Sequence, residues 1–246
     1  MRAFRFDMAV QYLFKILPFL KVTLTYVAAS LLIGIIFGFF LAVAKLGKNR
    51  FFKFLAYAYT VILRSIPSVV LIFLVYYGVP AIVKTLYNAD ISKADRLIFI
   101  IITLGLYSIA SISEIMRSSY QSVSRGQSEA AVSNGMTEFQ AFYRIVLPQA
   151  FIVSLPNMGN TVISLLKEGS LGFTIGLVDI MGRAVLLNAE TYSNNILEIY
   201  LGLAAVYWGI SILLEKAFSF LEHRCSMAYK IEMLSKREER ENAARL

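Results

Sequence analysis

The stretch that decides the fold runs from Val22 to Ala44 and reads VTLTYVAASLLIGIIFGFFLAVA, without one charged side chain. A helix in the core of a water-soluble protein normally keeps a polar face over such a length. A helix needs about 20 consecutive apolar residues to cross the hydrocarbon of a bilayer. The stretch is therefore typical of a membrane-spanning helix.

The composition of the whole chain extends this pattern. Of its 246 residues, 58% are hydrophobic and 16% are charged, whereas soluble domains average about 45–50% apolar and about 25% charged residues. We therefore predict an all-α, polytopic membrane protein that forms a single transmembrane domain over residues 1–246. The five expected spans are 22–44, 55–83, 97–115, 151–178 and 196–221.

Polar residues and glycines interrupt the apolar blocks at a few places. The second expected span contains Arg64 and Pro67, and the fourth is expected to be interrupted at Lys167 and Glu168. Gly-x-x-x-Gly spacing puts two small residues on one helix face and favours close packing of two helices. Two pairs are expected to act in this way, Gly34 with Gly38 and Gly172 with Gly176.

The formal net charge of +8 is concentrated in hydrophilic breaks between the apolar blocks. Membrane proteins carry such an excess on the cytoplasmic side, so topology explains the charge before lipid binding does, and nucleic acid is not expected as a partner. An odd number of spans places the C-terminus inside and the N-terminus outside, although Arg2, Arg5, Lys15 and Lys21 oppose that orientation. The clusters expected inside are Lys45, Lys48, Arg50 and Lys53, and Lys230, Lys236, Arg237, Arg240 and Arg245.

The chain offers little equipment for catalysis. It has one histidine, His223, and one cysteine, Cys225, and two potential ligands do not make a metal site. It contains no Gly-x-x-x-x-Gly-Lys-Ser/Thr loop, which cradles phosphates in ATP-driven motors. We therefore expect that this chain is not an enzyme and binds neither a metal ion nor a cofactor.

The connection at 119–150, which the orientation places in the cytoplasm, predicts a helix, a sharp turn and a second helix. Ser128 is a plausible N-cap with Glu129 at the positive helix end, and Gly135 is a natural stop. Thr137 begins the second helix, and Pro148 is expected to break it before the next span. Such an element can dock into a groove on a soluble partner or rest on lipid headgroups, and this pattern leaves both interpretations open.

Particular residues in this connection resemble the EAA signature of ABC importer permeases. The resemblance implies a type I permease fold, in which this segment fits into an ATP-binding subunit that holds ATP and Mg²⁺. It also implies a second permease subunit, an external substrate-binding protein and a bacterial inner membrane. The residues that carry the signature are Glu129, Ala130, Ala131, Gly135, Ile145, Leu147 and Pro148.

Other segments are similar to those of polar amino-acid permeases, among them 63–67, 114–117, 155–157 and 166–171. Two departures stand out: Ser65-Ile66 follows Arg64 where Gly-Thr is common, and Glu168-Gly169 replaces Asp-Thr or Asp-Ser. With the segment 173–182, this version resembles permeases for cystine and related amino acids. The resemblance implies ATP-driven import of a polar amino acid, by a homodimer or a heterodimer.

Charged groups inside spans are costly and therefore usually face a partner or a cavity. An amino acid needs donors for its carboxylate and an acceptor for its ammonium group, which interrupted helices can offer. The substrate-pathway candidates are Arg64, Ser65, Lys167, Glu168 and Ser170. The alternative is that Lys167 and Glu168 only pair with neighbours.

Two further charged pairs have different expected roles. Glu114 and Arg117 are spaced i, i+3, which predicts a structural or gating pair on one helix face. Asp179 and Arg183 are expected at the outer end of the fourth span, where a capture protein could dock.

Two competing functions stay open. A secondary transporter would use intramembrane carboxylates and usually an internal repeat, but no convincing repeat is present and the 119–150 connection would lack a purpose. A non-transport membrane protein would use that connection only as an interaction surface.

Overall fold

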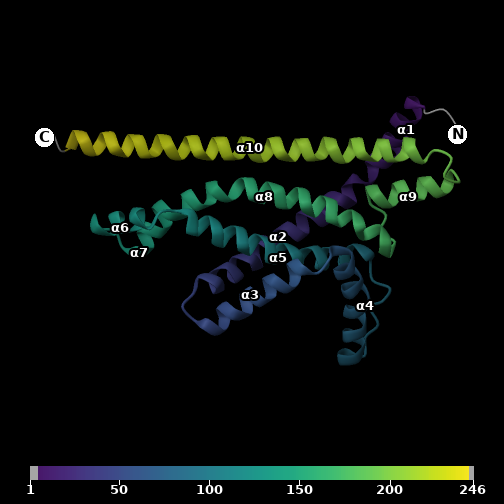
Figure 1. Ribbon diagram of the computed structural model, residues 1–246, viewed down its shortest axis with the longest axis horizontal. Coiled ribbons are helices and arrows are strands. Elements are labelled where there is room, and N and C mark those ends of the chain that lie inside the picture. The colour runs from purple at the N-terminus through teal and green to yellow at the C-terminus, as the bar shows by residue number, and fades with distance from the viewer. Residues whose placement is uncertain (1–4, 244–246) are drawn as a thin grey trace. The chain divides into compact units, whose positions relative to one another are not determined.

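The computed structural model describes the backbone of residues 5–243 and the side chains of residues 5–227 and of Tyr229. The regular secondary structure of these residues is all helical, with no strand among them (Figure 1). The α-helices are α1 (Phe6–Ile16), α2 (Leu20–Leu46), α3 (Arg50–Ser65), α4 (Ser68–Tyr87), α5 (Arg96–Ser122), α6 (Arg125–Ser133), α7 (Glu138–Ala141), α8 (Leu147–Gly169), α9 (Ile180–Glu190) and α10 (Ile196–Ala243). Two 3₁₀ turns (Leu17–Phe19, Ser170–Ile175) and a π-helical turn (Phe142–Val146) join some of them.

Four helical segments of the described chain are long and apolar enough to cross a membrane, and a bent pair makes up to five. The prediction of an all-α, multi-pass membrane protein is confirmed. The segments are Phe6–Leu46, Ser68–Tyr87, Arg96–Ser122 and Ile196–Met227, and the bent pair is Glu138–Ile175 with Ile180–Glu190, at 45°.

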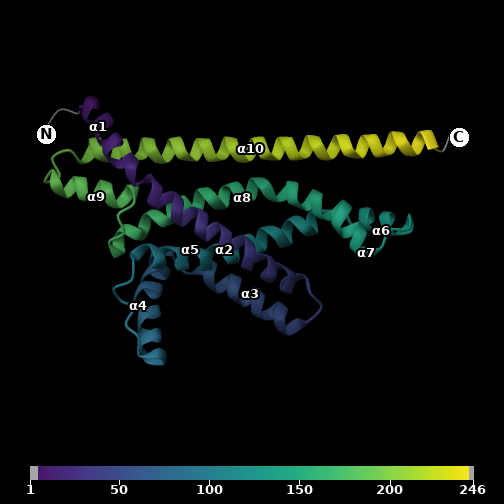
Figure 2. The same ribbon diagram turned by 180° about the vertical axis from the view of Figure 1, so that it is seen from behind.

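The second expected span, 55–83, is wrong as a single helix. α3 ends at Ser65 and α4 begins at Ser68, with Ile66 in an extended conformation between them. A proline disfavours helical geometry in the residue before it, so Pro67 forces the extended backbone at Ile66. Figures 1 and 2 show α3 lying beside α2 in the opposite direction, while α4 leaves that direction.

The interruption expected at Lys167 and Glu168 is also wrong. α8 runs without a break through both residues to Gly169, and the irregular segment comes after them. It consists of the 3₁₀ turn Ser170–Ile175 and an extended connection, with Gly176 at a φ of 82° between them. Glycine adopts such a positive φ at little cost, so the break follows the glycines rather than the charges.

The chain forms two compact units, Met1–Glu114 with Thr161–Ile212, and Ile115–Asn160 with Leu213–Leu246. In the first unit, α2 packs on α5 through small residues. A Cβ atom at Gly34 would lie 2.0 Å from Oγ of Ser108, and one at Gly38 would lie 3.2 Å from the backbone nitrogen of Ser113. The packing role predicted for this glycine pair is confirmed.

The second pair, Gly172 and Gly176, does not form a helix-packing face. Gly172 lies in the 3₁₀ turn against Leu177 and Ile100, and Gly176 ends that turn. The prediction for this pair is wrong because the chain leaves helical geometry between the two residues.

A further core of the first unit lies where α1, α9 and α10 meet. Its buried side chains include Tyr12 and Ile16 of α1, Leu187 of α9 and Ile199 of α10. The amide of Asn195 donates to the hydroxyl of Tyr12 at 3.0 Å. The N-terminal helix is therefore part of the packed structure of this unit.

Candidate functional site

The 119–150 connection forms a compact element in the second unit. α6 begins at Arg125, so Ser128 lies inside the helix and the N-cap predicted for it is wrong. α5 ends at Ser122, and Ser124, with φ −59° and ψ 129°, is the non-helical residue directly before α6. Glu129 consequently lies within α6 rather than at its positive end.

The turn that follows α6 has the predicted geometry. Gly135 has a φ of 86°, and its N–H donates to the carbonyl of Val132 at 2.9 Å while the N–H of Met136 donates to that of Ala131 at 3.1 Å. Paired bonds of this kind with a left-handed glycine end many helices. The sharp turn predicted at Gly135 is confirmed.

The second helix begins at Thr137, as expected. Its hydroxyl accepts from the backbone N–H of Gln140 at 3.2 Å, and the Gln140 side chain accepts from the N–H of Thr137 at 3.0 Å. This reciprocal capping satisfies two donors that a helix start leaves free. Pro148 does not break the helical run, which is a correction. A π-helical turn precedes it, and the altered hydrogen-bond spacing there accommodates a residue without an N–H.

The element has a packed side and an open side. Ala131, Ala141 and Val146 are buried, and Gln149 hydrogen-bonds through its side chain to Gln127. The seven residues of the expected signature divide between the sides: Ala131 is buried, Ile145 and Pro148 are half-buried, and Glu129, Ala130, Gly135 and Leu147 are exposed.

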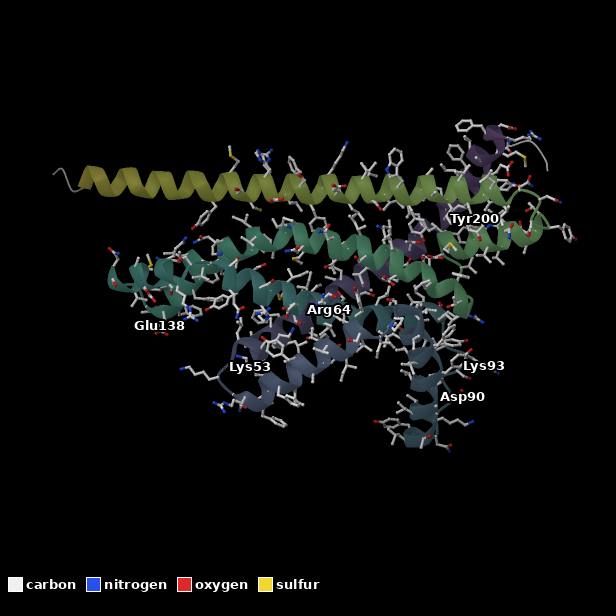
Figure 3. The ribbon with its side chains drawn as sticks, in the orientation of Figure 1. Lys53, Arg64, Asp90, Lys93, Glu138 and Tyr200 are labelled. Carbon is white, nitrogen blue, oxygen red and sulfur yellow. The ribbon has the colours of Figure 1, made fainter. Side chains whose placement is uncertain are left out.

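An aromatic pair marks the open side. The side chains of Phe139 and Tyr143 are 74% and 62% exposed, and their rings stack with centroids 6.4 Å apart. Phe139 lies in α7 and Tyr143 in the π-helical turn that follows it; Glu138, the first residue of α7, is labelled in Figure 3. Sequence reasoning did not single out this pair, although its i, i+4 spacing places both rings on one helix face.

The pathway candidates lie at the ends of two helices of the first unit. Arg64 and Ser65 are exposed at the end of α3 (Figure 3), and Lys167 is exposed near the end of α8, where Glu168 is half-buried. The hydroxyl of Ser170 donates to the carbonyl of Lys167 at 2.6 Å. Within the described side chains, no hydrogen bond or ion pair joins Arg64 to the α8 group.

Asp179 does not lie where a docking protein could reach it. Its side chain is fully buried and accepts from the N–H of Gly182 at 2.9 Å, which caps α9. Arg183 pairs with Glu190, with 2.7 Å between Nη1 and Oε1. The docking role expected for Asp179 is therefore wrong, because the helices packed around it bury its side chain.

Glu114 forms an ion pair with Lys45, at the end of α2. Its Oε2 lies 3.1 Å from Nζ of Lys45, and that ammonium group also donates to Oγ of Ser113 at 2.9 Å. The sequence places Lys45 among the basic residues of the first connection, but it lies at the end of α2 and its side chain is fully buried. Arg117 donates to the side chain of Gln121, and the Glu114–Arg117 pair stays a prediction.

The other basic clusters used for the orientation are only partly described. The side chains of Arg2, Lys230, Lys236, Arg237, Arg240 and Arg245 lie outside the described residues. Among the side chains that are described, no group of three or more His, Cys, Asp or Glu residues could hold a metal ion.

Comparison with known proteins places these features in a family. The family described as "Binding-protein-dependent transport system inner membrane component" matches residues 34–226. The L-cystine transport system permease protein TcyL of Bacillus subtilis (strain 168) is 40% identical over 223 residues, 91% of this chain and 92% of that protein. The nopaline transport system permease protein NocM of Agrobacterium fabrum is 37% identical over 210 residues, 85% of this chain and 86% of that protein.

Solved structures agree with the sequence comparison. A crystal structure of an amino acid ABC transporter with histidines is 30% identical, with a TM-score of 0.78 over 91% of this chain and all of that one. An inward-facing structure of the MetNI methionine ABC transporter is 17% identical, with a TM-score of 0.61 over 85% of this chain and 94% of that one. This second likeness shows the fold alone.

Proposed function

Because this chain belongs to the family of inner membrane components of binding-protein-dependent transport systems, we propose that it is the permease subunit of an importer for a polar amino acid, with cystine favoured. The cystine, nopaline and arginine permeases among its relatives support an amino-acid substrate. The cystine permease TcyL is 40% identical to this chain, which supports a cystine-type side chain.

In this proposal residues 1–246 act as one permease domain whose energy comes from a separate ATPase. The observation that carries the proposal is the capped element at 125–148, which presents two stacked, exposed aromatic rings. Exposed aromatic side chains on a rigid, short helix are suited to fill a pocket on a partner. ATP and Mg²⁺ would bind to that partner, and this chain would bind no cofactor.

The remaining partners follow from the same arrangement. One bundle of about five spans scarcely encloses a pathway, so a second permease subunit, identical or different, would complete it. A substrate-binding protein would deliver the amino acid from outside, and membrane lipid would cover the remaining apolar surface. The C-terminus would lie in the cytoplasm and the N-terminus outside, in a bacterial inner membrane.

The substrate would pass the break after α8 and the end of α3. Lys167 and Arg64 are exposed cations without a hydrogen bond or ion pair among the described side chains. An unpaired cation at membrane depth is stable only where water or a ligand reaches it. Lys167 and Arg64 would therefore attract the substrate carboxylate, Glu168 its ammonium group, and Ser65 and Ser170 would line the same route.

The test is co-expression of the chain with its chromosomal neighbours, purification of the assembly, and measurement of ATP hydrolysis with candidate amino acids and the binding protein. Stimulation by a binding protein loaded with one amino acid would support the importer and identify its substrate class. Purification without an ATPase, together with uptake that follows an ion gradient, would overturn the proposal in favour of a secondary transporter.

A further inference from the structure

A buried tyrosine contacts both ends of the irregular segment that follows α8. Tyr26 lies on α2 and is fully buried. A Cβ atom at Gly169, the last residue of α8, would lie 2.1 Å from Cε2 of Tyr26, so the ring rests directly on the glycine backbone. The hydroxyl of Tyr26 donates to Oδ2 of Asp179, the N-cap of α9, at 3.1 Å.

Asp179 makes more contacts than a helix cap requires. Its Oδ1 accepts from the N–H of Gly182, which satisfies the start of α9. Its Oδ2 accepts from Tyr26 and, at 3.5 Å, from the hydroxyl of Thr23, and both of these residues lie on α2. A buried carboxylate is costly unless it is hydrogen-bonded, so these bonds hold the start of α9 against α2.

The chain has little freedom to move at either end of this contact. A Cβ atom at Gly182 would lie 2.2 Å from the carbonyl oxygen of Leu177, so the backbone folds closely on itself at the start of α9. At Gly169 the absence of a side chain is what admits the Tyr26 ring. Close-packed interiors transmit such constraints because side chains there have no empty volume to move into.

The residues beside this contact have no comparable support of their own. The side chains of Lys167 and Glu168 make no hydrogen bond or ion pair among the described residues. Their positions are therefore set by the backbone of the last turn of α8. That turn ends at Gly169, which lies against the ring of Tyr26. The arrangement separates a buried positioning group from the exposed charges that would meet a substrate.

From these contacts we infer that Tyr26, Gly169 and Asp179 form a clamp that positions Lys167 and Glu168 for the transported amino acid. The inference rests on the proposed function for its substrate. Tyr26 and Asp179 are buried and do not touch the substrate. They act as positioning residues. The ring of Tyr26 occupies the space that a side chain at residue 169 would need.

The first test is amino-acid uptake by the assembly of this chain with its ATPase and binding protein in proteoliposomes. Gly169→Ala places a methyl group that overlaps the edge of the Tyr26 ring. We expect the KM for the amino acid to rise about tenfold, with a smaller change in kcat. The double variant Gly169→Ala with Tyr26→Leu removes the overlap but also the hydroxyl that bonds Asp179, so its KM should fall to that of the Tyr26→Leu single variant. Gly78→Ala is the matched control, because a Cβ at Gly78 meets nothing within 4 Å.

Tyr26→Phe separates the ring from the hydroxyl. It keeps the contact with Gly169 and loses the bond to Asp179, so we expect a smaller rise in KM than for Gly169→Ala. An equal loss of kcat in the Gly169→Ala and Tyr26→Phe variants, with KM and the preference among amino acids unchanged, would show a merely structural role. A double variant whose KM stays well above that of Tyr26→Leu in folded protein would also overturn the clamp.

A second measurement does not depend on transport. Lys167→Cys in a Cys225→Ser background gives one thiol beside the clamp, whose rate of reaction with a water-soluble maleimide reports the exposure of that position. We expect Gly169→Ala to change this rate and the double variant with Tyr26→Leu to show the rate of Tyr26→Leu alone. An unchanged rate would overturn the clamp, whether or not the assembly transports an amino acid. Absence of transport by the wild-type assembly would count against the proposed function alone.

Discussion

Nζ of Lys45 lies 3.1 Å from Oε2 of Glu114, and the lysine side chain is fully buried while the glutamate side chain is 28% exposed. The pair joins the end of α2 to α5 across 69 positions of the chain. The ammonium group also lies 5.7 Å from the centre of the Tyr57 ring on α3. One buried cation of α2 thus contacts two other helices of the same unit.

This asymmetry in exposure predicts an asymmetry between variants. Glu114→Gln leaves a buried ammonium group without its carboxylate, and removing one partner of a buried pair costs about 3–5 kcal/mol. Lys45→Met replaces the buried cation with an apolar side chain of similar length and should cost less. Thermal unfolding of the purified protein in detergent should rank Glu114→Gln below Lys45→Met, with the double variant near Lys45→Met. The reverse order would contradict the buried cation.

The packing of α2 on α5 gives a second prediction. Gly34→Ala puts a methyl group 2.0 Å from Oγ of Ser108, and overpacking of this kind costs about 1–3 kcal/mol. The melting temperature in detergent should fall. Gly209→Ala, on α10, is the control, since a Cβ there meets nothing within 4 Å. Equal melting temperatures for the two variants would argue against the close approach of the helices.

The turn after α6 gives a third prediction. Gly135→Pro fixes φ near −65° where the turn needs 86°, so ATP-driven uptake should be lost while the protein still inserts in the membrane. Gly126→Ala, inside α6 and without a close contact, is the control and should retain uptake. Normal uptake by Gly135→Pro, measured in whole cells at matched expression, would remove the coupling role.

Charge reversal on α6 tests the same role without disturbing the turn. Glu129 is exposed inside α6, so Glu129→Lys should change the free energy of unfolding by no more than about 0.5 kcal/mol. We expect uptake to be abolished nonetheless, because the changed charge would face the ATPase. Retained uptake would show that this residue does not contact the motor.

The exposed aromatic pair gives the last prediction. Replacing Phe139 and Tyr143 together with serine should reduce co-purification of the ATPase by about tenfold or more, the scale of an interface hot spot. Tyr192→Ser is the matched control, because Tyr192 is 89% exposed on the connection between α9 and α10. If both variants retain the ATPase equally, the docking surface lies elsewhere.

Features that depend on neighbouring residues were predictable from the sequence. The uncharged run from Val22 to Ala44 indicates a span because crossing a bilayer requires consecutive apolar residues. Gly135 and Thr137 predicted the turn and the second helix start because left-handed backbone and capping are local requirements. The family followed from the signature in the same segment.

Boundaries inside the spans were less predictable. The charges at Lys167 and Glu168 suggested an interruption, but helix geometry depends on backbone bonds, which these side chains leave intact, and the chain breaks only after Gly169. The extended residue before Pro67 turned one expected span into two helices. Pattern and composition report how apolar a segment is, not how many straight pieces it contains.

The residue pattern was enough to predict the membrane-spanning class, the turn at Gly135 with the helix start at Thr137, and the family. The burial of Lys45 against Glu114 became known from the tertiary structure alone, as did the contacts of Tyr26 with Gly169 and with Asp179, which lies 153 positions after Tyr26. Contacts of this kind depend on which helix faces pack together. Hydrophobic periodicity shows which face is apolar, but the partner of a buried polar group is selected by the three-dimensional packing of segments far apart in the chain.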